Sequence, residues 1–155
     1  MKKNSANPPV VLSFSVLDPS GAGGIQADIE TAASIGCHCT PIITSMCVDG
    51  FAPDTETLSM DNTLIIEQAR SVLENMDVLA IKVGFLGSPE MAETVHTILQ
   101  DYNHIPVISH PVLGLLDYEN PEHVDLVGAY KELILPLSTV ASFSLYEARE
   151  VAKES

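Results

Sequence analysis

Hydrophobic residues follow two different periods along this chain, and the change from one period to the other marks its elements. Short apolar runs rich in β-branched residues are typical of buried strands. We predict strands at Val10 to Val16, Thr40 to Val48, Val78 to Val83, Val107 to Ser109 and Val140 to Phe143. The stretch from Thr55 to Met60 is either a short edge strand or a flap.

Between these runs, apolar residues recur with the spacing of amphipathic helices. We predict helices from Ile25 to Gly36, from a cap at Asp61 or Asn62 through Leu73, from a cap at Ser88 through Leu99, from Pro121 to Leu135 and from Leu145 to Lys153. Strands that alternate with helices form a mostly parallel sheet with helices on both faces and right-handed crossovers. The fold class is therefore α/β.

The length of 155 residues fits one domain with one substantial core. Residues 1–9 form a flexible lead-in and residues 10–155 the domain, with no internal repeat. Because no apolar run has the length of a signal-peptide core or a membrane span, we expect a cytoplasmic protein with no membrane contact.

Charge and cysteine content exclude several classes of function. The formal net charge is −14, with seven Lys and Arg against 21 Asp and Glu. Such a surface repels phosphate backbones, so nucleic acid is not an expected partner. The three cysteines, Cys37, Cys39 and Cys47, contain no CxxC pair, which argues against a disulfide framework and against a zinc site.

The turn after the first predicted strand is rich in glycine. Ligands of open parallel sheets sit beyond the carboxyl ends of the strands, so Asp18 is the side chain we most expect to face a ligand. Gly21, Gly23 and Gly24 permit close approach of a small polar molecule to the backbone. The alternative is a tight strand-to-helix turn in which the glycines serve geometry alone.

Two nucleotide-binding motifs can be tested on the same turn. A P-loop requires Lys and Ser or Thr after its last glycine, whereas Ile25 and Gln26 follow Gly24. A dinucleotide fingerprint requires a third glycine at Gln26. The P-loop is excluded, and a nucleotide-binding oxidoreductase fragment remains a weak alternative.

The segment from Asp18 to Thr31 resembles the opening signature of hydroxymethylpyrimidine and phosphomethylpyrimidine kinases, which belong to the ribokinase superfamily. Further matching segments follow in the family's order: Ile43-Thr44-Ser45, Lys82 to Ser88, Pro111-Val112, Leu135-Pro136-Leu137 and Tyr146-Glu147-Ala148. The resemblance covers almost the whole chain from Val10 onward. It implies the N-terminal part of a three-layer, ribokinase-like sheet.

The resemblance implies a role in the metabolism of the pyrimidine moiety of thiamin. The family transfers phosphate from ATP, with Mg²⁺, to hydroxymethylpyrimidine or its phosphate. Residues that match its pyrimidine site are Asp18, Gly21, Gly23, Gly24, Asp49, Phe85 and Val112, and Glu147 matches a residue of the magnesium end. The family's ATP site and catalytic turn lie beyond the point that matches Ser155, so we assign no catalytic residue and expect this chain alone to be inactive.

Within the matched half, four positions depart from the family pattern. Val16-Leu17 adds bulk beside Asp18, and Asp49 replaces a glutamine that hydrogen-bonds the pyrimidine. His110 replaces an aspartate and Ser144 an asparagine at the magnesium and phosphate end, although hard magnesium prefers carboxylate to imidazole. These changes favour lost or altered activity, and the alternative function is a non-catalytic pyrimidine-binding or protein-interaction module.

Several of these residues also have ordinary structural interpretations. Lys82 ends a strand, Asp28 suits a helix N-terminus, and Phe85 is as typical of core packing as of a stacking surface. The strand from Val140 to Phe143 is expected to lie at an uncovered edge of the sheet. We therefore expect a homo-oligomer or a complementing chain.

Overall fold

The computed structural model describes residues 7–50, 56–116 and 119–153. Its centre is a six-stranded sheet in the order β3-β2-β1-β4-β5-β6. The strands are β1 (Val10–Leu17), β2 (His38–Cys47), β3 (Thr57–Ser59), β4 (Val78–Val83), β5 (Val107–Ser109) and β6 (Val140–Ala141). All neighbouring pairs are parallel except β2 and β3, which confirms the predicted mostly parallel sheet.

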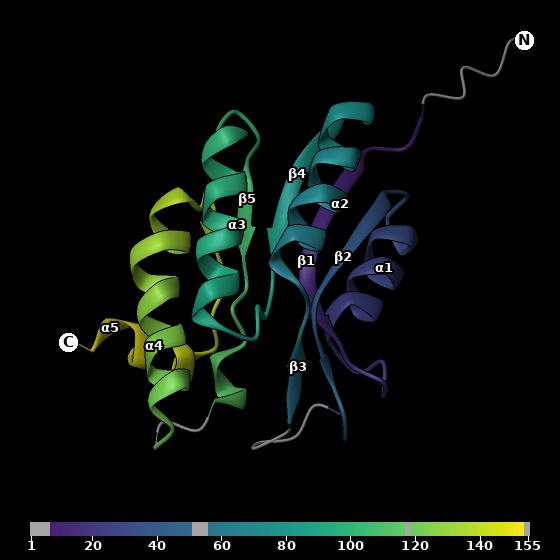
Figure 1. Ribbon diagram of the computed structural model, residues 1–155. Coiled ribbons are helices and arrows are strands. Elements are labelled where there is room, and N and C mark those ends of the chain that lie inside the picture. Colours follow the sequence, from purple (N-terminus) through teal and green to yellow (C-terminus); the bar gives the residue numbers. More distant parts are fainter. Residues whose placement is uncertain (1–6, 51–55, 117–118, 154–155) are drawn as a thin grey trace, which may run out of the picture.

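Helices connect the strands and cover the sheet. They are α1 (Gly24–Ser34), α2 (Asn62–Asn75), α3 (Pro89–Asp101), α4 (Pro121–Ala129) and α5 (Leu145–Ala152). Helices α2, α3 and α4 stand side by side along the sheet (Figure 1). Helix α1 packs against β1 and β2.

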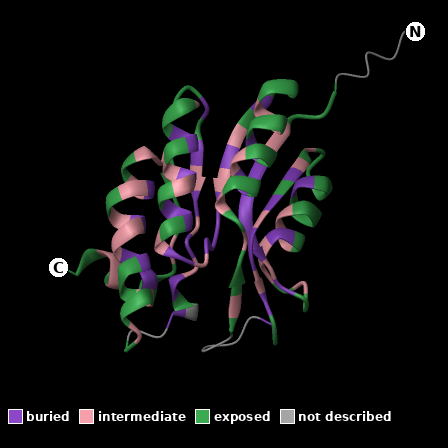
Figure 2. Ribbon diagram, in the orientation of Figure 1, coloured by how far each residue is buried: buried purple, intermediate pink, exposed green. Residues whose placement is uncertain are grey.

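Alternate residues of β1 show which face each layer covers, because successive side chains of a strand point to opposite sides. Leu12 and Phe14 are fully buried in the main hydrophobic core, together with Ile65 of α2 and Val95 of α3. Ser13, between them in sequence, bonds to α1 on the other side. The core thus lies between the sheet and the α2–α3 layer (Figure 2), and α1 covers the opposite face.

The predicted starts of α2, α3 and α4 are confirmed by their side-chain caps. Ser88 accepts a hydrogen bond from the Met91 amide at 3.2 Å, with Pro89 at the first helical position. Of the two possible caps of α2, Asp61 is the one that the structure shows, because its carboxylate accepts from the Leu64 amide at 2.9 Å. Helix α4 follows a cap at Asn120.

Several predicted boundaries differ from the structure by one or two residues, and the end of the helix that begins at Pro121 differs by more. The helix that we predicted from Pro121 to Leu135 is α-helical only to Ala129, and a π-helical turn, η2 (Tyr130–Ile134), and a 3-10 turn, η3 (Leu135–Leu137), follow it. The strand predicted from Val140 to Phe143 ends at Ala141, because Ser144 already caps α5 and the chain must turn before it.

The stretch predicted as an edge strand or flap contains β3, which pairs antiparallel to β2 at the sheet edge. Its first residue, Thr55, lies outside the described residues, as does most of the predicted lead-in 1–9. The cysteines at 37, 39 and 47 are unbridged, as predicted. Within the described ranges, no helix combines the length and apolar character needed to span a membrane.

Candidate functional site

The turn between β1 and α1 is organised by a buried aspartate. Asp18 is 0% exposed, and its carboxylate accepts hydrogen bonds from the Ser20 amide at 2.8 Å and the Gly23 amide at 3.2 Å. The Ser20 hydroxyl also lies 2.8 Å from the carboxylate. The carboxylate that we expected to face a ligand is therefore directed into its own turn, where it shapes the backbone.

These hydrogen bonds also determine the ionisation of Asp18. Burial alone raises its pKa, but hydrogen bonds from the Ser20 hydroxyl and from the amides of Ser20, Gly23 and Ala22 outweigh burial and hold the pKa below its usual value. The group stays ionised at neutral pH and acts as an acceptor for the turn.

Among the glycines of this turn, Gly24 is required by geometry. It has φ +64°, and a Cβ there would lie 2.3 Å from the Val16 carbonyl oxygen. Gly23, by contrast, has an extended backbone with φ −151°, which any residue adopts. Gly23 is also the N-cap of α1 and provides no side-chain cap, so backbone amides at the start of α1 are left for other acceptors.

Helix α1 is fixed beneath this turn by a partly buried ion pair. Asp28 Oδ2 accepts from Lys82 Nζ of β4 at 2.8 Å and from Ser13 Oγ of β1 at 2.7 Å. The structural interpretation of Lys82 is thus supported. Asp28 does more than favour the helix dipole, since it ties α1 to two strands.

The turn after β2 lies against the first turn. A Cβ on Gly50 would be 3.9 Å from Asp18 Oδ1 and 4.0 Å from Ser20 Cβ. The charge of Asp18 contributes, after burial, to a raised pKa of the Cys47 thiol at the end of β2. The structure therefore brings Asp18 next to the turn that carries Asp49, whose side chain is exposed.

The turn after β4 contains Gly84 and Phe85. Gly84 is tightly enclosed: a Cβ there would lie 2.4 Å from Ser15 Oγ and 2.6 Å from Lys82 Nζ. Phe85 is 4% exposed, so its side chain is part of the core in this structure. Thr44 and Tyr130, which the sequence did not single out as site residues, both bond to carbonyl groups of this turn.

The turn after β5 contains the backbone outlier of the described chain. Val112 has φ +53°, a left-handed conformation that a β-branched residue adopts at a cost of about 1–3 kcal/mol. It is the only non-glycine residue in the described ranges with positive φ. Strain of this kind concentrates at functional sites, and Val112 as a ligand contact stays a prediction.

Glu147 lies near this turn but already has partners. Its carboxylate accepts from the Ser144 amide at 2.7 Å, and the Ser144 hydroxyl accepts from the Glu147 amide at 3.2 Å, which forms a capping box at the start of α5. Burial raises its pKa, but the Ser144 bonds and the nearby His110 outweigh burial and lower it. His110 Nδ1 lies 3.0 Å from the Ser142 carbonyl oxygen.

The donor set near Glu147 does not by itself fit magnesium. Mg²⁺ requires near-octahedral oxygen coordination, and one carboxylate oxygen of Glu147 accepts from a helix cap. Within the described ranges, no three His, Cys, Asp or Glu residues form a group able to hold a metal ion. The assignment of Glu147 to magnesium stays a prediction.

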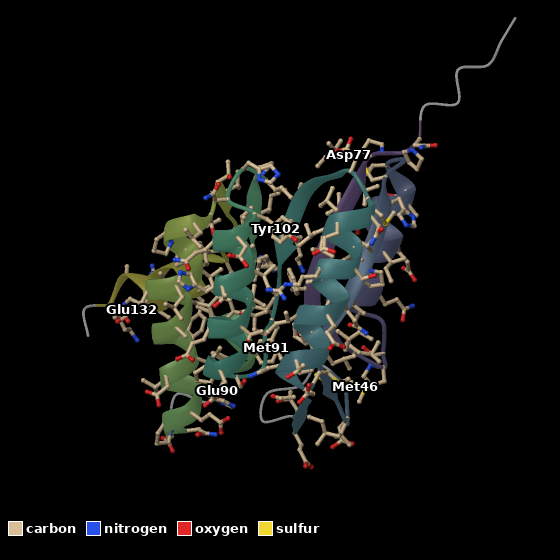
Figure 3. All side chains as sticks on the ribbon, turned by 45° about the horizontal axis from the view of Figure 1, so that its top comes forward. Met46, Asp77, Glu90, Met91, Tyr102 and Glu132 are labelled. Carbon is tan, nitrogen blue, oxygen red and sulfur yellow. The ribbon has the colours of Figure 1, made fainter. Side chains whose placement is uncertain are left out.

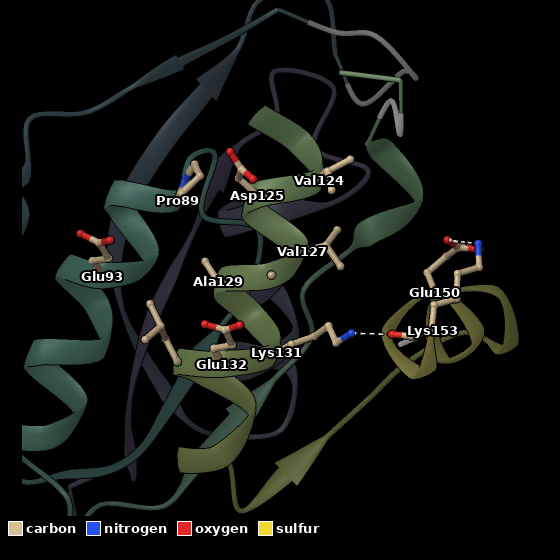
Figure 4. A pocket seen from close by; sticks show the side chains of 12 residues that line it. Pro89, Glu93, Val124, Asp125, Val127, Ala129, Lys131, Glu132, Glu150 and Lys153 are labelled. Carbon is tan, nitrogen blue, oxygen red and sulfur yellow. Dashed lines mark hydrogen bonds and ion pairs between the residues drawn. The ribbon is translucent and has the colours of Figure 1, made fainter. Parts of the chain in front are cut away.

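A cavity of about 610 Å³ lies away from these turns, around α4 (Figure 4). Its two lysines have partners in the chain: Lys131 Nζ donates to the Lys153 carbonyl oxygen at 2.6 Å, and Lys153 Nζ donates to Glu150. Acidic side chains, Glu93, Asp125 and Glu132, also line it. These features do not favour an anionic ligand.

The candidate site is thus the edge of the sheet where β1, β2, β4 and β5 end. Figure 3 shows the two ends of the molecule, with Met46 near the end of β2 at one and Asp77, just before β4, at the other. The predicted residues Asp18, Asp49, Phe85 and Val112 all follow strands at the Met46 end.

A family model described as phosphomethylpyrimidine kinase matches residues 18–155. The hydroxymethylpyrimidine/phosphomethylpyrimidine kinase of Streptomyces coelicolor is 30% identical over 150 residues, which are 93% of this chain and 53% of that enzyme. The thiamine biosynthesis multifunctional protein ThiED of Corynebacterium glutamicum is 30% identical over 139 residues, which are 86% of this chain and 18% of that protein.

Solved structures agree with these relatives. The pyridoxal kinase of Bacillus subtilis, solved as an ADP complex, is 25% identical with a TM-score of 0.78, over 93% of this chain and 53% of that one. The sheet is therefore that of a ribokinase-like kinase, and this chain spans about half of the Streptomyces and Bacillus enzymes. Since the family model matches nearly the whole sequence, the chain belongs to the phosphomethylpyrimidine kinase family.

Proposed function

We propose that this chain forms the pyrimidine-binding half of a phosphomethylpyrimidine kinase, and that these 155 residues alone bind the pyrimidine without transferring phosphate. The ligand class is hydroxymethylpyrimidine or its monophosphate, and the pathway is formation of thiamin. The binding place is the sheet edge formed by the turns after β1, β2, β4 and β5.

The observation that carries this proposal is the turn from Asp18 to Gly24. Its buried carboxylate orders the backbone, and Gly24 admits no side chain. The helix start that follows has no side-chain cap, so its amides can donate to a polar ring substituent. Gly24 is explained by its packing against β1, whereas the uncapped helix start is the feature that favours a ligand.

The remaining predicted residues take parts in the same proposal. Gly21, Gly23 and Gly24 bring the backbone close to the ligand, Val112 forms an apolar wall, and Asp49 accepts a hydrogen bond from the pyrimidine amino group. Phe85 packs in the core beneath the turn after β4 and supports its backbone. Glu147 matches the family's magnesium end, but its carboxylate caps α5, so the proposal assigns no metal to the described residues. The family's phosphate donor is ATP, and its site lies outside the matched half.

A titration calorimetry experiment tests the binding. The full chain is titrated with hydroxymethylpyrimidine and separately with its monophosphate, and saturable binding of at least one is expected. No binding of either at millimolar ligand would refute the proposal. A coupled ADP-release assay with Mg-ATP should give no turnover above a no-protein control, and turnover would refute the second half of the proposal.

A second candidate, protein interaction, rests on the C-terminal edge of the sheet. Val140 in β6 is 54% exposed, and Leu145 and Tyr146 at the start of α5 are 71% and 52% exposed. Edge strands with exposed apolar side chains tend to pair with another chain. A homo-oligomer or a complementing chain at this edge is compatible with pyrimidine binding at the other turns.

A further inference from the structure

The turn after β4 is held by two side chains that come from distant parts of the chain. Tyr130 Oη, in the π-helical turn η2, donates to the Gly84 carbonyl oxygen at 2.5 Å. Thr44 Oγ1, in β2, donates to the Phe85 carbonyl oxygen at 3.0 Å. Two successive carbonyl groups of the turn are thus bound by hydroxyl groups that are both fully buried.

Tyr130 also lies near the other end of the same turn. The Leu86 amide lowers the pKa of the Tyr130 hydroxyl, although burial raises that pKa by more. The phenol is therefore close to both ends of the Gly84–Leu86 turn and donates to the first of them. Burial raises the pKa of Tyr130 far above its usual range, which keeps the hydroxyl protonated and able to donate.

This arrangement determines the position of Phe85. The Gly84 amide donates to the Phe14 carbonyl oxygen of β1 at 2.8 Å, so the start of the turn is also fixed to the sheet. Phe85 lies between the two bound carbonyl groups and is 4% exposed. If either hydroxyl group is removed, a buried carbonyl loses its partner, and the turn is expected to shift until that group finds another.

We propose that Tyr130 and Thr44 are positioning residues, whose hydroxyl groups fix the Gly84–Leu86 turn and thereby the backbone at the sheet edge where the pyrimidine is proposed to bind. This inference rests on the proposed function and extends it to two residues that do not touch the ligand. The π-helical turn has a direct role in it, because Tyr130 begins that turn.

Two variants remove single oxygen atoms. In Tyr130→Phe and Thr44→Val, the affinity for hydroxymethylpyrimidine in calorimetry should fall about tenfold, equivalent to about 1.4 kcal/mol. Thr44→Ser retains a hydroxyl group and should bind like the wild type. In Tyr130→Phe, the Leu86 amide should exchange with solvent at least tenfold faster in NMR, since the turn loses the hydroxyl group that holds its Gly84 carbonyl.

Two controls separate positioning from general destabilisation. Tyr102→Phe makes the same chemical change at the end of the sheet where Asp77 lies (Figure 3), and Ile134→Val loosens the core within the same π-helical turn as Tyr130. Both should retain wild-type affinity and Leu86 exchange, measured at a temperature where every variant is folded.

The outcomes distinguish the two proposals. Wild-type affinity together with unchanged Leu86 exchange in Tyr130→Phe would overturn the positioning role, as would an equal loss of affinity in Ile134→Val. If the wild type binds no pyrimidine, the proposed function is wrong. In that case the exchange rate of the Leu86 amide is the remaining test of whether Tyr130 holds the turn. An unchanged rate in Tyr130→Phe would overturn this role as well.

Discussion

Gly24 combines a left-handed backbone with a position that has no room for a side chain. A Cβ at Gly36 meets no atom within 4 Å, although its φ of +80° is similarly unfavourable for other residues. A comparison of substitutions at the two glycines therefore distinguishes the cost of backbone strain from the cost of steric exclusion. Gly24 lies at the start of α1 beside the candidate site, and Gly36 just beyond the end of the same helix.

The matched pair Gly24→Ala and Gly36→Ala tests this difference. Gly36→Ala should lose about 1–2 kcal/mol of unfolding free energy from the left-handed conformation alone. Gly24→Ala should lose about 1–3 kcal/mol more, because the new methyl group meets the Val16 carbonyl. Urea unfolding measures both, and equal losses would show that the turn adapts to a side chain.

The ionisation of Asp18 makes the stability of the fold depend on pH. Its pKa is lower in the folded chain than in the unfolded chain. Its ionised form therefore stabilises the fold fully above the unfolded value of about 3.9, and this contribution is lost as the pH falls through the folded value. Below both values, the contribution is absent.

Asp18→Asn should therefore weaken the acid dependence of unfolding and lower stability at pH 7 by about 1–3 kcal/mol, because one amide oxygen cannot accept from both sides of the turn. Ser20→Ala keeps the carboxylate but removes one donor, so it should show a smaller change in the same direction. Thermal unfolding from pH 2 to pH 7 measures these effects. An Asp18→Asn curve parallel to the wild type would contradict the linkage.

At the scale of elements, strands and helix starts were predictable from sequence because their causes are local. Ser88 and Pro89 define the start of α3 within a few residues, and the apolar run of β1 needs no distant partner to be recognised. The π-helical turn at Tyr130 was not predictable. Lys131 and Glu132 fit an ordinary helix, and the bond from Tyr130 is made to Gly84, which is 46 residues away.

In the candidate site, too, local features were predictable from the sequence and long-range contacts were not. The turns themselves were located from the strand ends, but the inward direction of Asp18 was not, because it depends on three-dimensional hydrogen bonds from Ser20 and Gly23. The roles of Thr44 and Tyr130 likewise depend on contacts between elements that are far apart in sequence.

The edge strand β6 gives a prediction at this scale. Val140 is 54% exposed on β6, and Leu79 is 52% exposed on β4, so the two positions are matched in exposure. If β6 pairs with another chain, Val140→Lys should disrupt self-association, because charge on an edge strand opposes pairing, whereas Leu79→Lys should not.

Light scattering at micromolar concentration measures this association. The wild type and Leu79→Lys should be larger than a 16.6 kDa monomer, and Val140→Lys should approach it. A monomeric wild type would contradict association of the chain with itself through this edge.

The whole molecule carries a formal net charge of −14, which acts on any charged ligand before contact. A uniformly acidic surface repels an anionic ligand over roughly 10 Å at 0.1 M salt, and added salt screens that repulsion. Hydroxymethylpyrimidine is uncharged at its reacting group, whereas its monophosphate is anionic. The two ligands should therefore respond differently to salt.

Raising the sodium chloride concentration from about 20 mM to about 200 mM should strengthen binding of the monophosphate relative to the alcohol, by severalfold. Calorimetry of both ligands at constant pH measures the ratio of their dissociation constants. A ratio that moves in the opposite direction would mean that a local cation attracts the phosphate more strongly than the overall charge repels it.

The bond between Tyr130 and Gly84 also has a consequence for the order of folding. It joins residues 46 positions apart, so closing it costs more chain entropy than forming the helices that lie between them. During synthesis, Gly84 leaves the ribosome well before the tyrosine that holds its carbonyl. The turn after β4 should then mature late, after β1, β2 and β4 have paired, and a nascent chain that ends before Tyr130 should pair these strands without a finished turn at the proposed binding place.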